Sequence, residues 1–306
     1  MKHTFQPRAL AAFAVSFITF LLSSLLLTLA CILTDRPLFY LGGGAWIAFC
    51  ILLALNAACQ IPLTLISRDL AARRPTPGRA AFAGILAALA SLAFSIGSVY
   101  RAFTASGVVR IPLLVTALFA LIGAVGLALH AVYPGAYPTV EVLTLSPLPL
   151  SCVSYVLSLY FETSVPKNGS LKLLLSLCFI LLAVYLVTGI RRTIGEPRPR
   201  LSLFLARTAA PLLASVAFAA LFLKIFRGLS LFGATAYVFL AVFSFYMFIV
   251  SCVPALGDLS VSRDGSPAAT EDEEDLPAAQ DSSLPLDPPR VTGPTTPPTE
   301  NRHESE

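Results

Sequence analysis

Residues 173–190 read "LLLSLCFILLAVYLVTGI", and the basic stretch "RRTIGEPRPR" follows directly at residues 191–200. A helix rises about 1.5 Å per residue, so about 20 apolar residues cross the hydrocarbon core of a bilayer, which is about 30 Å thick. The first stretch has nearly that length and contains no charged residue. It therefore predicts a membrane-spanning helix, with the arginines of the second stretch at its end.

The whole chain has the composition of a membrane protein. Of its 306 residues, 56% are hydrophobic and 12% are charged, and the mean hydropathy is +0.79. Soluble domains carry about 25% charged residues. Seven runs have the length of a span: 10–33, 41–66, 80–100, 111–132, 171–190, 201–223 and 230–252. An eighth run, 147–163, is shorter and begins with prolines. The sequence predicts an all-α, polytopic transmembrane helix bundle of about eight spans.

The basic residues predict the orientation of these spans, because cytoplasmic loops collect lysine and arginine. The two densest basic loops, 67–79 and 191–200, lie on one side of the membrane only if 147–163 is a span. Eight spans then place both termini in the cytoplasm of a multi-pass cell (inner) membrane protein. The residues expected to anchor the cytoplasmic face are Arg73, Arg74, Arg79, Arg191, Arg192, Arg198 and Arg200. A phosphate or lipid-headgroup site in the second loop is the alternative.

The acidic residues define a second segment. The first 256 residues hold 18 of the 21 basic residues and five of the 17 acidic ones, whereas the last 50 hold 12 acidic residues. Residues 1–256 are thus the predicted helix bundle, and 257–306 a disordered, proline-rich, acidic cytoplasmic tail. The tail either contacts the arginine loops or is a solvated tether, which salt screening favours. The net charge of +4 averages two opposite segments and indicates no nucleic-acid partner.

The best candidate binding residues lie in the second span. Asn56, Gln60 and Thr64 are spaced by four residues and share one helix face. Pro62 in the same helix is expected to free a backbone carbonyl. Such a polar stripe lines a substrate path or forms hydrogen bonds between helices, and the second interpretation is favoured.

Arg207 is the other candidate, because charge inside a span is costly. It lies near the expected cytoplasmic end of its span, so its side chain is expected to extend toward the headgroups. Binding of a substrate anion is the alternative interpretation.

Two stripes of small residues predict that the third and fourth spans pack as a hairpin. The first stripe is Gly84, Ala88, Ser91, Ser95 and Ser98, and the second is Thr116, Ala120, Gly123 and Gly126. His130 continues the second stripe near the expected inner surface, with no acidic residue expected nearby. The chain also lacks metalloprotease, serine-hydrolase and P-loop motifs. We therefore expect no catalytic residues, no metal site and no cofactor, and nothing in the sequence argues for an enzyme.

One segment, 160–201, resembles uncharacterised multi-spanning bacterial membrane proteins. The shared residues are Tyr160, Phe161, Glu162, Pro166, Asn168, Gly195, Pro197, Pro199 and Arg200. The resemblance covers about 40 residues and implies a bacterial inner-membrane location without implying an activity.

Two functions agree with these features. The favoured one is a non-catalytic scaffold, sensor or partner subunit, which contacts a protein partner through its cytoplasmic loops or tail. The alternative is a small-molecule facilitator or permease that uses the stripe in the second span and has no carboxylate at the membrane centre.

Overall fold

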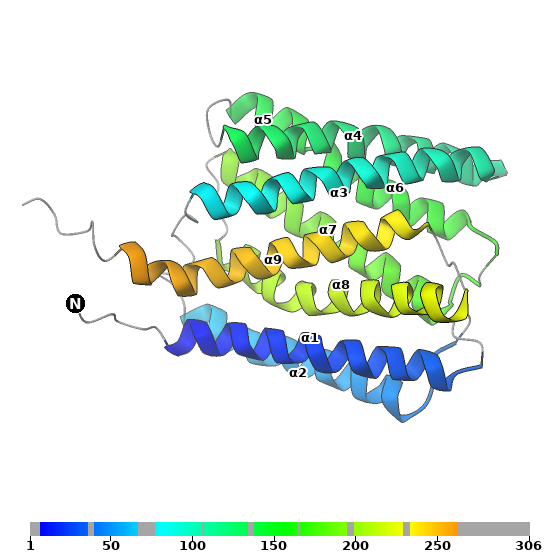
Figure 1. Ribbon diagram of the computed structural model, residues 1–306, viewed down its shortest axis with the longest axis horizontal. Coiled ribbons are helices and arrows are strands. Elements are labelled where there is room, and N and C mark those ends of the chain that lie inside the picture. Colours follow the sequence, from blue (N-terminus) through cyan, green and yellow to red (C-terminus); the bar gives the residue numbers. More distant parts are fainter. Residues whose placement is uncertain are drawn as a thin grey trace, which may run out of the picture. The chain divides into compact units, whose positions relative to one another are not determined.

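The computed structural model describes residues 7–35, 40–66, 77–105, 107–133, 138–164, 166–194, 199–228 and 233–261. Helices make up the regular structure of these ranges, which contain no strand (Figure 1). They are α1 (Pro7–Leu33), α2 (Gly44–Ile66), α3 (Pro77–Thr104), the 3₁₀ turn η2 (Gly107–Val109), α4 (Arg110–Val132), α5 (Pro138–Leu145), α6 (Pro147–Phe161), α7 (Ser170–Thr193), α8 (Pro199–Arg227) and α9 (Ala234–Val261). The predicted all-α fold is confirmed.

Seven segments of the described chain are long and apolar enough to cross a membrane, and residues 234–249 of α9 form a shorter apolar helix. Large apolar side chains such as Leu25, Phe103 and Leu118 point outward, while serine and threonine side chains are buried between helices. This distribution is typical of helices whose solvent is hydrocarbon. The protein is therefore a multi-pass membrane protein whose apolar helices contact the bilayer.

The fifth span differs from the prediction. It runs over Thr139–Phe161 and consists of α5 and α6, so most of the expected loop 133–146 is helical. The two helices meet at Ser146, whose backbone N–H still donates to the Val142 carbonyl at 3.0 Å. Pro147 has no N–H, so the next helical hydrogen bond is absent and α6 begins there.

The C-terminal boundary also differs, because α9 continues to Val261 and so includes the first five residues of the expected tail. The rest of the predicted tail lies outside the described residues.

The α3–α4 hairpin is confirmed, but the glycines of α4 have other neighbours. Ser95 Oγ of α3 donates to the Ala117 carbonyl of α4 at 2.7 Å. A Cβ on Gly126 would lie 2.7 Å from the carbonyl carbon of Thr144, and one on Gly123 would lie 2.8 Å from Leu148. These two glycines face α5 and α6, so the stripe of α4 does not pack on α3 over its whole length.

Helices α1, α2 and α8 form the part of the bundle that carries the candidate residues. Ser16 Oγ donates to the Arg207 carbonyl at 2.7 Å, and Ser23 Oγ lies 2.5 Å from Ser215 Oγ. The residue that comes later in α1 pairs with the residue that comes later in α8, so the two helices run parallel. Gln60 Nε2 of α2 reaches the carbonyl of Ala12, near the start of α1. Since Gln60 is near the end of α2, that helix runs antiparallel to the other two.

Candidate functional site

The predicted polar stripe of α2 faces α1 and α8 inside the bundle. Asn56, Gln60 and Thr64 are 2%, 0% and 4% exposed. Asn56 Nδ2 donates to the Arg207 carbonyl at 3.3 Å, and Gln60 Nε2 donates to the Ala12 carbonyl at 2.9 Å. These two side chains therefore connect α2 to both neighbouring helices. The helix itself continues through Pro62 to Ile66, so the proline does not end it.

The Arg207 carbonyl accepts two hydrogen bonds, from Ser16 Oγ and from Asn56 Nδ2. The backbone of Arg207 thus links α8 to α1 and α2. Its side chain takes no part in these two hydrogen bonds. We call the set Ser16, Asn56, Gln60, Thr64 and Arg207 the Arg207 cluster.

The Arg207 side chain does not extend to the surface as expected, because the residue is only 1% exposed. Helix α8 packs against α1, α2, α7 and α9. Among the residues that the structure describes, Nε and Nη1 of Arg207 are buried and have no hydrogen-bond partner.

Two oxygen atoms of the cluster can also accept a hydrogen bond that they do not receive. Gln60 Oε1 and Thr64 Oγ1 are buried without a hydrogen-bond partner in the described part of the chain. The Thr64 hydroxyl can donate as well as accept a hydrogen bond, and the two Arg207 nitrogens are donors of the charged kind that pairs with anions.

Of the seven predicted basic anchor residues, four belong to the ends of helices and three lie outside the described residues. Arg191 is half-buried near the end of α7, and Arg200 is exposed near the start of α8. Arg79 and Arg192 belong to α3 and α7, but their side chains are outside the described set. Arg73, Arg74 and Arg198 lie outside the described residues altogether.

A buried acid near His130 was missed by the sequence analysis. Glu141 of α5 is 2% exposed, and its Oε2 lies 3.0 Å from His130 Nδ1. The sequence contained a usable signal, since Pro138 followed three residues later by Glu141 is typical of a helix N-terminus. A helix starting at Pro138 would have placed Glu141 in its first turn.

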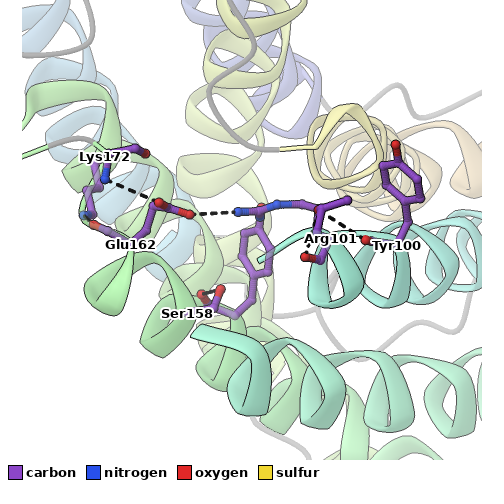
Figure 2. Close-up of polar contacts among 8 residues, drawn as sticks. Tyr100, Arg101, Ser158, Glu162 and Lys172 are labelled. Carbon is purple, nitrogen blue, oxygen red and sulfur yellow. Dashed lines mark hydrogen bonds and ion pairs between the residues drawn. The ribbon is translucent and has the colours of Figure 1, made fainter. Parts of the chain in front are cut away.

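A second charged cluster, also missed, connects α3, α6 and α7 (Figure 2). Arg101 Nη2 lies 3.5 Å from Glu162 Oε2, and Arg101 Nη1 donates to the Tyr155 hydroxyl at 3.1 Å. Lys172 Nζ donates to the Glu162 backbone carbonyl at 2.7 Å. Glu162 thus lies between two cations, so the cluster has its own internal acceptors and is best explained as a link between helices.

Within the described ranges, no three His, Cys, Asp or Glu residues come together as a group able to hold a metal ion. Comparison of the chain with family models, curated proteins and solved structures gives no match.

Proposed function

We propose that the protein is a non-catalytic membrane component, a sensor or partner subunit, that binds an anionic group at the Arg207 cluster. One observation carries the proposal: two nitrogens of a 1% exposed guanidinium lack a partner among the described residues. Burying an ionised group without a counter-charge costs several kcal/mol, which a bound anion would offset.

The hydrogen bonds of Asn56 and Gln60 support a fixed binding site rather than an open path. Each side chain is held by a backbone carbonyl of a neighbouring helix. Hydrogen bonds of this kind between membrane helices contribute about 1 kcal/mol each. Together they hold α1, α2 and α8 around Arg207, and a bound anion would stabilise the same three helices.

A facilitator is the second candidate, and the depth of the stripe favours it. Asn56 lies close to the middle of α2, and buried polar residues at that depth often mark the path of a solute. Contacts of the basic loops and acidic tail with a protein partner, the cytoplasmic location of both termini and a cell-membrane address stay predictions.

The experiment measures the thermal unfolding of the full chain in phosphatidylcholine nanodiscs with chloride, phosphate, sulfate, acetate and hexadecanoate. At 100 times its Kd, a ligand that binds only the folded state stabilises it by about 2.7 kcal/mol. Arg207→Gln should remove the anion-dependent shift. Arg200→Gln, which changes an exposed arginine about two turns earlier in α8, should leave it intact. The absence of a shift with every anion would overturn the proposal.

Flux into liposomes separates the two candidates. Simultaneous replacement of Asn56 and Gln60 by leucine should weaken the bundle in either case. If the wild-type protein carries the bound anion across the liposome membrane, the facilitator is the correct function and the sensor proposal fails.

A further inference from the structure

Helix α8 contains a proline at the position that frees the Arg207 carbonyl. In an α-helix the N–H of residue i+4 donates to the carbonyl of residue i, so the donor for Arg207 would come from residue 211. That residue is Pro211, which lies inside α8 and has no N–H. The freed carbonyl receives the hydroxyl of Ser16 from α1 and the side-chain amide of Asn56 from α2. Pro211 therefore leaves α8 an acceptor that both neighbouring helices use.

Helix α1 is hydrogen-bonded to α8 on both sides of this proline. Before it, Ser16 donates to the Arg207 carbonyl. After it, Ser23 Oγ lies 2.5 Å from Ser215 Oγ, which itself donates to the Pro211 carbonyl at 2.6 Å. Sharp bends of helices are found at prolines, and in membrane helices neighbouring side chains satisfy the freed backbone groups. Pro211 is therefore the point at which α8 can bend, with α1 bonded to both parts.

The part of α8 before the proline, residues 199–210, carries the charge. The guanidinium of Arg207 is buried in the observed attached position, where Nε and Nη1 have no partner among the described residues. A bend at Pro211 that releases the Arg207 carbonyl would let the side chain move toward water. The release breaks hydrogen bonds that are individually weak between membrane helices, and it relieves the desolvation of an unpaired charge. Because these two costs oppose each other, an anion that pairs with the charge shifts the balance toward the attached position.

We propose that Pro211 makes α8 a hinge and that anion binding at Arg207 controls its position. With an anion bound, residues 199–210 stay attached to α1 and α2, and without one they bend away for part of the time. This inference rests on the proposed anion site and adds its regulation. A ligand shifts such an equilibrium only through different affinities for the two positions. The guanidinium provides this difference, because an anion pairs with it strongly only where it is shielded from water.

The hinge gives the proposed sensor a movable part. Residues 199–210 extend over about 18 Å at 1.5 Å per residue, so a bend of about 20° at Pro211 moves the first residue of α8 by about 6 Å. That residue, Pro199, belongs to the basic loop 191–200, which is expected to face the cytoplasm. A protein partner at this loop would therefore respond to the anion.

The test measures hydrogen–deuterium exchange of the full-length protein in phosphatidylcholine nanodiscs, with and without phosphate or acetate. A detached segment of 12 residues is at the lower limit of helix stability in water, so the amides of residues 199–210 exchange when it is released. At 100 times the Kd of the anion, this exchange should slow by up to about 100-fold, because only the attached position binds the anion. The amides of α4 are the internal control and should be unaffected.

Three variants separate the hinge from a general effect on stability. Pro211→Ala supplies the missing N–H, so exchange of residues 199–210 should be slow without the anion and should not respond to it. Ser16→Ala removes one attachment, so exchange should be faster without the anion, and anion binding should weaken as the attached fraction falls. Pro62→Ala is the matched control: it changes a helix-interior proline of α2 and should leave the anion response of α8 intact.

The outcomes distinguish the hinge from the anion site. If a bound anion leaves exchange of residues 199–210 unchanged, or slows the amides of α4 equally, the hinge is overturned and the anion site stands. The same conclusion follows if Pro211→Ala responds to the anion as the wild type does. If no anion shifts the thermal unfolding of the wild type, the proposed function fails, and its regulation fails with it.

Discussion

Replacement of Arg207 by methionine tests the central energetic claim about this protein. Methionine keeps an unbranched side chain of similar length and removes the charge. The Arg207 carbonyl, which accepts the hydrogen bonds of Ser16 and Asn56, is unchanged by the substitution. Only the contribution of the guanidinium to stability is therefore altered.

The expected result is an increase in the free energy of unfolding of the anion-free protein. Replacing a buried ion pair by well-packed apolar residues of similar volume is often neutral or stabilising by about 1–4 kcal/mol, and a buried charge without a partner has no attraction to offset its desolvation. Arg207 belongs at the favourable end of this range, because its Nε and Nη1 have no partner within the described chain to lose. The same variant should lose stabilisation by every anion that stabilises the wild type.

The assay is reversible unfolding in mixed micelles, with and without the anion. Arg200→Met is the control, since an exposed substitution should change stability by no more than about 0.5 kcal/mol. If Arg207→Met destabilises the anion-free protein by more than about 2 kcal/mol, the guanidinium has a partner that satisfies it, and the reasoning behind the anion site is wrong.

Two further predictions concern the α4–α5 contact and are checked by the same unfolding measurement. Gly126→Ala should destabilise the protein by about 1–3 kcal/mol, because its Cβ would lie 2.7 Å from the backbone of Thr144. Gly189→Ala is the control: nothing lies within 4 Å of its Cβ, so it should be neutral or slightly stabilising, and equal effects of the two would contradict the close approach. Glu141→Leu should lower the free energy of unfolding by about 1–3 kcal/mol, because it removes the partner of His130. Adding His130→Leu to this variant should lower it little further. Additive losses from the two substitutions would show that the pair does not interact.

Sequence alone predicted the features that depend on local composition. A window of about 20 residues contains what is needed to recognise a span, which is why most spans were found close to their observed limits. The fifth span was underestimated because Thr139, Glu141 and Thr144 lower the hydropathy of its first part. Glu141 is accommodated there because it pairs with His130 of α4, and Thr144 Oγ1 donates to the Val140 carbonyl of its own helix.

For the candidate site too, local sequence predicted some features, and only the tertiary structure showed the others. The spacing of Asn56, Gln60 and Thr64 placed them on one face of one helix, since four residues are about one helical turn. Their partners are backbone carbonyls on other helices, and Asn56 and Arg207 are separated by 151 positions in the chain. No local pattern encodes such a pairing.

Local sequence thus determined that this chain forms apolar helices for a bilayer, because hydropathy and helical periodicity act over a few turns. Only tertiary packing decided that Arg207 is almost fully buried, on a helix that packs against four others. The physical reason is that the environment of a side chain is set by helices distant in sequence. The same arginine would be an ordinary interfacial residue on a helix with a free face.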